Sequence, residues 1–129
     1  MKKYTYLQVK RAFGYRLFGR KSTNRIVIKT VLLMPSEIIK FVTSNCWFVS
    51  SFEDGWAFTL KVEDLKKGEY LIFLSDELLE SNESQIMYTI AHEIGHVVLG
   101  HRNSFKEIQS KAEIRRQEKE ADEFARNVV

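Results

Sequence analysis

Two histidines and a glutamate in the C-terminal half of the chain have the residue types and the spacing of a metal site. They form the pattern His92-Glu93-x-x-His96. On a helix, residues four apart lie on one face, so both imidazoles can reach one metal ion at about 2.0–2.1 Å. Glu93 lies about 100° further round the helix, beside the metal and within reach of its water. The pattern therefore predicts a zinc ion, two of its ligands and a general base for hydrolysis.

The residues around this pattern have the periodicity of an amphipathic helix. At about 100° per residue, the apolar side chains fall within one sector of about 120°, and the two histidines fall on another face. The apolar residues are Ile86, Met87, Ile90, Ile94, Val97 and Val98. Asn82 can cap the helix, with Gln85 completing a capping box, and Gly100 fits just past its end. We therefore expect one helix with a face for the core and a separate face for chemistry.

A third metal ligand is expected from a last helix over residues 109–129, because a catalytic zinc ion takes three protein ligands and keeps one open position. The candidate carboxylates are Glu113, Glu118, Glu120, Asp122 and Glu123. Helix phase favours Glu118, which shares an inward face of mostly small residues, whereas Glu120 lies about 160° away and should point to water. The other residues of that face are Ile114, Ala121 and Ala125. Asp122, one turn after Glu118, is placed to hold the second ring nitrogen of a ligand histidine.

His101 and Tyr88 are auxiliary candidates. His101 is an alternative third ligand, but in the metzincin pattern the third histidine stands ten residues after the first, where this chain has Arg102. His101 also follows the helix-ending Gly100, so we interpret it as a capping or supporting residue. Tyr88 borders the metal face, where its hydroxyl can stabilise an oxyanion, although packing at the rim of the site is the simpler interpretation.

The two motifs together resemble those of the ImmA/IrrE family of metallopeptidases, and more broadly those of gluzincins with a Glu-x-x-Ala-Asp helix. They are His92-Glu-Ile-Gly-His96 and Glu118-Lys-Glu-Ala-Asp122-Glu-Phe-Ala125. The resemblance covers about residues 70–129. It implies a compact zincin-like α+β domain, in which a small sheet precedes the active-site helix and a C-terminal helix carries the last ligand. It also implies that the substrates are helix-turn-helix repressors.

We therefore expect a zinc-dependent endopeptidase that acts on a regulatory protein such as a transcriptional repressor. Its metal ligands would be His92, His96 and Glu118, with Glu93 as the general base. The alternative is a non-proteolytic regulatory module of the same fold, which would bind a repressor or DNA through a basic N-terminal segment at residues 1–34. The intact Glu93 favours the enzyme, because a binding module has no need of a general base.

The composition indicates one folded domain over residues 1–129. Apolar residues make up 44% of the chain, and it has only six glycines and one proline, which excludes a disordered protein. No apolar run approaches the roughly 20 residues of a membrane span, and no apolar stretch of a secretory signal follows the basic N-terminus. The single Cys46 cannot form an internal disulfide and should be a buried apolar residue beside Trp47. We expect a cytoplasmic protein without a membrane partner.

The charge is distributed unevenly along the chain. Residues 1–36 contain nine lysines and arginines and no acid; because the whole chain carries +3, residues 37–129 carry −6. The basic residues are Lys2, Lys3, Lys10, Arg11, Arg16, Arg20, Lys21, Arg25 and Lys29. A basic segment of this kind can attract nucleic acid or an acidic protein surface. The simpler interpretation, which we favour, is the solvated face of an amphipathic first helix.

The rest of the chain predicts a small sheet among helices. Helices are expected over residues 5–18 and after Pro35, strands over 26–33, 46–52, 56–62 and 70–74, and turns or connections over 19–24, 53–55 and 64–68. The second and third strands would form a hairpin. The fourth strand, just before the active helix, can offer an edge to an extended substrate. The aromatic residues expected in the core or in hairpin pairs are Phe41, Trp47, Phe48, Trp56, Phe58, Tyr70 and Phe73.

Overall fold

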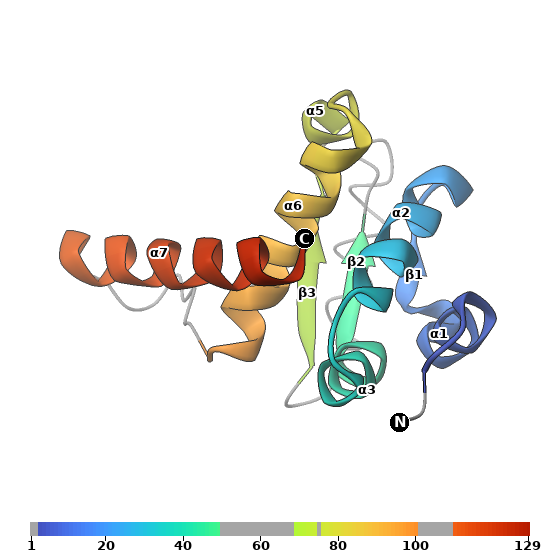
Figure 1. The fold of residues 1–129 in the computed structure, drawn as a ribbon. Coiled ribbons are helices and arrows are strands. Elements are labelled where there is room, and N and C mark those ends of the chain that lie inside the picture. The colour runs from blue at the N-terminus through green and yellow to red at the C-terminus, as the bar shows by residue number, and fades with distance from the viewer. Residues whose placement is uncertain (1–2, 50–68, 75, 101–109) are drawn as a thin grey trace.

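The computed structural model describes residues 3–49, 69–74, 76–100 and 110–129, and over these residues the chain has an α+β fold (Figure 1). The helical elements are α1 (Tyr6–Phe13), the 3-10 turn η1 (Gly14–Arg16), α2 (Lys21–Leu32), α3 (Ser36–Asn45), α5 (Asp76–Leu79), α6 (Glu83–Val98) and α7 (Lys111–Val128). The strands are β1 (Leu17–Phe18), β2 (Cys46–Val49) and β3 (Tyr70–Phe73). This is the expected fold class, with a small sheet ahead of the long helix α6.

The three strands form a parallel sheet in the order β1-β2-β3. In the central strand, Phe48 lies opposite Leu17 of β1 on one side and opposite Ile72 of β3 on the other. All four residues of β2 are buried, as is usual for a strand in a parallel sheet. Among the described strands, β3 lies at one end of this order, on the side of the following helix α6.

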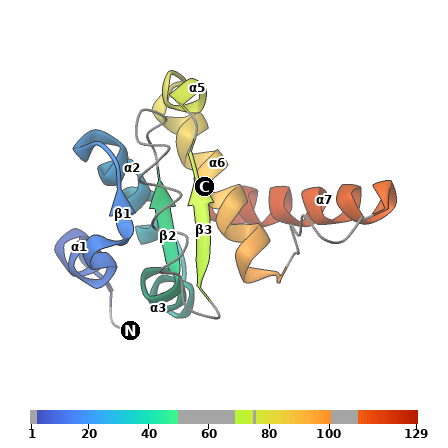
Figure 2. The ribbon, with the colours of Figure 1, turned by 180° about the vertical axis from the view of Figure 1, so that it is seen from behind.

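Helices α2 and α6 lie on the same face of the sheet, and α7 packs across α6 (Figures 1 and 2). The side chains that fill the space between these layers are apolar and almost fully buried. They include Val27 and Val31 of α2, Ile72 of β3, and Ile86, Ile90 and Ile94 of α6. An ion pair between Lys29 and Glu83, 2.8 Å long, also joins α2 to the start of α6. The sheet and α2 therefore hold one face of α6 and leave another face for α7.

Both ends of α6 are set by the residues predicted to set them. The Asn82 Oδ1 atom accepts a hydrogen bond of 2.8 Å from the backbone N–H of Gln85. After the helix, Gly100 has a φ of 71° and its N–H donates to the carbonyl of Val97, in a conformation that favours glycine. Helix α7 begins in a similar way, because the hydroxyl of Ser110 accepts from the N–H of the third helical residue. The predicted active helix and last helix are thus confirmed.

The predicted strand over residues 26–33 is wrong, because these residues belong to helix α2. That helix also begins at Lys21, inside the predicted connection over residues 19–24. The β-branched residues of this segment recur at helical spacing and form one buried stripe, which consists of Thr23, Val27, Thr30 and Val31. Packing of this stripe in the core outweighs the strand preference of its residues.

The predicted helix over residues 5–18 is shorter in the structure. It begins as expected, because Thr5 and Gln8 form a reciprocal capping box. It stops at Phe13, because the next residue is Gly14 with a φ of 59°. After the turn η1, the apolar residues that continue the sequence pattern join the sheet as β1. The helix predicted after Pro35 is confirmed as α3, and Pro35 is its N-cap residue.

The strand predictions at 46–52 and 70–74 are confirmed over Cys46–Val49 and Tyr70–Phe73. The predicted hairpin partner, with its turns and the residues Trp56 and Phe58, falls within residues 50–68 and lies outside the described residues. The described neighbours of β2 are both parallel to it. Parallel neighbours need crossover connections, so the pairing of β2 with β3 differs from a hairpin.

The aromatic residues divide between the core and the surface. Trp47 and Phe48 are buried, as predicted. Phe41, Tyr70 and Phe73 were expected in the core or in hairpin pairs, but each keeps 37–38% of its surface exposed. The rings of Phe41 and Tyr70 lie 6.2 Å apart and pack against each other at the surface beside the edge strand. The alternation of a strand at the edge of the sheet leaves part of its apolar side chains outside the core.

Cys46 lies in the core, as predicted from its neighbours. Its side chain is fully buried, and desolvation raises the pKa of the thiol to about 12. Among the helices that the structure describes, none is long and apolar enough to cross a membrane.

We expect Cys46 to resist alkylation in the folded protein. The thiolate is the reactive form, and the ordinary thiol pKa of about 8.5 returns on unfolding. At pH 8, iodoacetamide should modify Cys46 at least about 100-fold more slowly in buffer than in urea, since burial blocks access and suppresses ionisation. Intact-mass spectrometry over time measures both rates. Equal rates in the two conditions would show that this part of the core is open.

Candidate metal centre

Helix α6 presents His92 and His96 on one face, and α7 brings Glu118 against them. The two imidazole rings stand nearly at right angles, with their Nε2 atoms 3.1 Å apart. The Glu118 carboxylate bridges them: one oxygen lies 2.9 Å from Nε2 of His92, and the other lies 3.1 Å from Nε2 of His96. His96 is 8% exposed, whereas the Glu118 side chain is 53% exposed. The cluster is therefore closed on the histidine side and open to solvent beside the carboxylate.

The geometry of these three side chains fits one metal ion. Ligand atoms bound to tetrahedral zinc at about 2.0–2.1 Å lie about 3.3 Å from one another, close to the separations observed here. One potential ligand atom from each of the three residues lies within 4.8 Å of the others. Two imidazole nitrogens and a carboxylate oxygen all offer lone pairs to the same region, and a shared cation satisfies them together. Nitrogen and oxygen ligands of this kind suit zinc.

The close approach of α7 to α6 depends on small residues. An added Cβ atom at Gly95 would lie 3.0 Å from Cδ1 of Phe124 and 3.2 Å from its Cβ atom, so the ring occupies the place of a side chain. On the opposite helix, Ala121 and Ala125 are fully buried. Sequence reasoning identified the two alanines but not the role of Gly95. A glycine in the middle of a helix costs about 1 kcal/mol of stability relative to alanine. A glycine at this position in the sequence could therefore have indicated a close contact with another element.

Asp122 lies behind His92, on the side away from Glu118. Its Oδ1 atom is 2.9 Å from Nδ1 of His92, which is the position predicted for it. Nδ1 is fully buried, and its contact with Asp122 does not have the geometry of a hydrogen bond. It is a close contact between the Asp122 carboxylate and the polar ring nitrogen. A carboxylate in this position would orient the ring of a histidine that ligates a metal ion through Nε2.

Tyr88 supports Asp122 rather than facing the open side of the site. Its hydroxyl donates a hydrogen bond of 2.8 Å to Oδ1 of Asp122. This hydrogen bond lowers the pKa of the Asp122 carboxyl, with smaller contributions from the neighbouring His92 and from the charge of Arg126. The same bond is the main reason that the pKa of Tyr88 is raised. Asp122 is therefore ionised and Tyr88 neutral at physiological pH, which keeps a negative charge behind His92.

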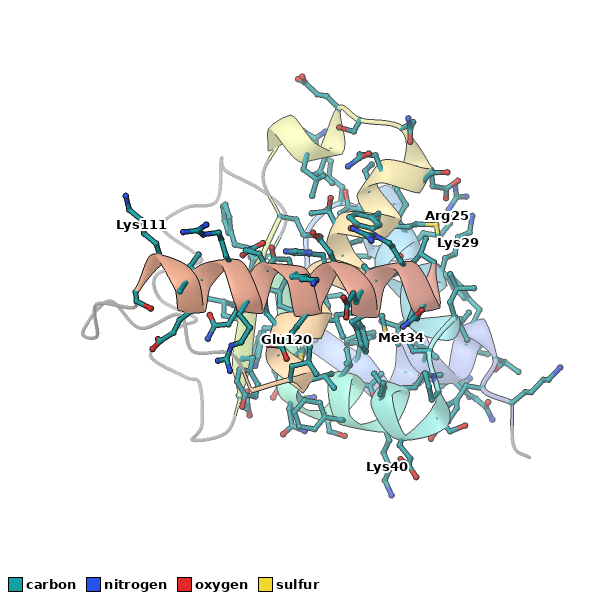
Figure 3. The ribbon with its side chains drawn as sticks, turned by 60° about the vertical axis from the view of Figure 1, so that its left-hand side comes forward. Arg25, Lys29, Met34, Lys40, Lys111 and Glu120 are labelled. Carbon is teal, nitrogen blue, oxygen red and sulfur yellow. The ribbon has the colours of Figure 1, made fainter. Side chains whose placement is uncertain are left out.

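The other predicted residues lie outside this cluster. Glu93, partly buried on α6, is next to His92 in the chain and is not one of the three grouped ligands. Glu120 is also outside the group; its side chain is 44% exposed and its carboxylate lies 3.9 Å from Nε of Arg116. Figure 3 shows Glu120 extending from one side of α7. His101 lies outside the described residues.

The predicted inward face of α7 needs one correction. Ile114 was placed on this face by helix phase, but it is 45% exposed. The reason is that the first turns of α7 project beyond α6 (Figure 1), and residues 111–116 are all exposed. Gln117 is the first buried residue of this helix.

Comparison with known families supports a peptidase. The sequence model of the family Peptidase U49 matches residues 84–129, a range that contains all but the first residue of α6, all of α7 and the three grouped residues. The match supports the peptidase part of the resemblance noted from the motifs and does not specify the ImmA/IrrE family. No curated protein and no solved structure matches the chain.

The carboxylates of α7 should differ in their effect on zinc affinity. We expect Glu118→Ala to weaken zinc binding by more than about 100-fold, Asp122→Asn by about 10–100-fold, and Glu120→Ala by less than about threefold. Competition with a zinc-binding dye measures all three, and His92→Ala serves as the control without a site. If Glu120→Ala were the most damaging change, the arrangement of ligands described here would be wrong.

The contact between Gly95 and Phe124 should control both stability and metal affinity. Gly95→Val pushes the ring away from α6, and overpacking of this kind costs about 1–3 kcal/mol of unfolding free energy. It should also weaken zinc binding, because Glu118 is carried by the displaced helix. In a Phe124→Ala background, Gly95→Val should have a smaller effect on zinc affinity, since the clash is gone. Denaturant unfolding and dye competition measure these effects, and Thr89→Val controls for a valine elsewhere on α6.

Proposed function

We propose that the chain is a zinc-dependent endopeptidase that cleaves a regulatory protein, such as a helix-turn-helix repressor. The observation that carries this proposal is the meeting of His92, His96 and Glu118 from two helices, with Glu93 beside the first histidine. Three nitrogen and oxygen ligands with one open side are typical of catalytic rather than structural zinc. The match of residues 84–129 to a peptidase family supports the same class of reaction.

The roles of the residues follow from their positions. His92, His96 and Glu118 would hold the zinc ion, which when bound polarises the scissile carbonyl and makes water a stronger nucleophile. Glu93 would accept the proton of the attacking water and deliver it to the leaving amine. Asp122 would orient His92 and raise its basicity through Nδ1, and Tyr88 would hold Asp122 in place.

The edge strand β3 is the part of the fold best suited to an extended substrate. It stands at one end of the described sheet and packs against α6, the helix that carries both histidines. An extended peptide can add to such an edge through main-chain hydrogen bonds. The exposed rings of Tyr70 and Phe73 on this strand would then contact apolar substrate side chains. Glu93 favours this enzymatic function over a binding module of the same fold, because binding alone does not need a base.

The test is the variant Glu93→Gln. It removes the base with almost no change in volume, so zinc content and unfolding should stay as in the wild type. Peptide-bond cleavage should fall by at least about 100-fold, as expected for the loss of general-base catalysis. The substrate for this assay is a helix-turn-helix repressor whose gene lies next to the gene for this chain. The products are identified by mass spectrometry.

Two controls make this result decisive. Glu120→Gln removes a carboxylate outside the ligand group and should cleave at the wild-type rate. A metal-free sample should regain activity on addition of zinc. Full activity of Glu93→Gln would show that another residue is the general base. A wild-type protein that neither binds zinc nor cleaves the repressor would contradict the proposal.

A further inference from the structure

A second cavity lies between the two N-terminal helices, apart from the metal centre. It has a volume of about 400 Å³. Residues of α1, η1, β1 and α2 line it: Tyr6, Lys10, Gly14, Leu17, Lys21, Asn24, Arg25 and Ile28. Its apolar floor is formed by Ile28, which is buried, and Leu17, which is partly buried. Figure 2 shows α1, β1 and α2, the elements that supply these residues, close together at the N-terminal end of the sheet.

Three cationic side chains surround this cavity, and they come from regular positions on two helices. Lys21 and Arg25 are four residues apart on α2, and Lys10 faces them from α1. Among the residues that the structure describes, no acidic side chain forms an ion pair with any of the three. The charge of Arg25 contributes slightly to the lowered pKa of Glu83, but the Glu83 carboxylate is already paired with Lys29 at 2.8 Å.

The three cations are exposed at the rim of the cavity, and their side chains surround its apolar floor. Lys21 is the first residue of α2 and Arg25 follows one turn later, so both lie near the helix end where a positive charge is unfavourable. The first turn of α2 also has no acidic residue, and its N-cap residue makes no side-chain cap. Like charges around one cavity repel each other, and a bound anion would relieve this repulsion.

The size of the cavity suits a small molecule, and its cations suit an anionic one. A volume of about 400 Å³ lies within the range of small-molecule sites and is concave, unlike the extended basic surfaces that follow a nucleic-acid backbone. Arginine and lysine bind phosphate oxygens through charge-assisted hydrogen bonds. The ring of Tyr6 and the apolar floor can contact an organic group attached to the phosphates. We infer that this cavity binds a small molecule that carries at least two phosphate charges.

Calorimetric titration of the full chain at low ionic strength tests this inference, with pyrophosphate and ADP as the probes. Both should bind with one site per chain. Lys21→Gln combined with Arg25→Gln should weaken both affinities at least about tenfold, because two charge-assisted contacts are lost. Adenosine, which lacks phosphate, should not bind measurably. Circular dichroism checks that each variant is folded.

A matched control separates the cavity from net charge. Lys40→Gln combined with Lys111→Gln removes the same charge from exposed positions on α3 and α7, far from Arg25 in Figure 3. This variant should keep the wild-type affinities within about twofold. Equal weakening by both pairs of substitutions would overturn the inference, because it would show only a general charge effect.

The remaining outcomes are also decisive. Absence of saturable binding by both probes would overturn the inference. So would binding of duplex DNA or of an acidic peptide that depends on Lys21 and Arg25 when pyrophosphate and ADP do not bind, since the cavity would then belong to a macromolecular surface. Pyrophosphate and ADP also bind zinc ions, so all of these titrations use metal-free protein; this inference and the proposed peptidase can then fail separately.

Discussion

The candidate site depends on how closely α7 can approach α6. The two histidines are four residues apart on one helix, and this spacing brings them together without help from the rest of the fold. Glu118 is 22 residues beyond His96, and it reaches the two histidines only because α7 packs closely across α6. The absence of a side chain at Gly95, whose place is taken by the ring of Phe124, sets this separation. A change of a few tenths of an ångström in the separation of α6 and α7 would move Glu118 relative to the two histidines. Protein interiors are packed too densely to absorb such a change elsewhere.

The same contact explains why the supporting residues lie where they do. Asp122 is one turn after Glu118, so a single helix supplies a group to each side of His92: Glu118 at Nε2 and Asp122 at Nδ1. Tyr88, one turn before His92 on α6, then closes the network by donating to Asp122. Successive members of this network therefore come alternately from α7 and α6, and each contacts the next. A site built in this way needs only α6 and α7 to be correctly placed, which agrees with the match of this segment to a peptidase family.

The parts of this structure that could be predicted from sequence are those governed by local rules. Asn82, Gly100 and Pro35 mark helix ends through their own backbone preferences, and Glu118 was separated from Glu120 by helix phase alone. The parts that failed depend on tertiary contacts. Val27 and Val31 have strand-forming side chains, yet their spacing suits a helix that packs against α6, and sequence alone did not decide between the two. Ile114 has the right phase for burial, but the helix extends beyond its partner at that point, and helix phase contains no information about where a partner ends.

Helix α2, which was predicted least well, lies between the candidate metal centre and the basic cavity. It packs against α6 on one side and α1 on another, so the metal centre and the basic cavity lie on opposite ends of the series α1, α2, α6 and α7. The ion pair of Lys29 with Glu83 ties α2 to the first turn of α6, which leaves Arg25, one turn earlier, for the cavity. The basic residues of the N-terminal region therefore do not form a separate arm. Four of the described cations are placed by α2 and α1: Lys29 pairs with Glu83 of α6, and Lys10, Lys21 and Arg25 line the cavity. Arg16 instead lies over the rings of Tyr15 and Trp47.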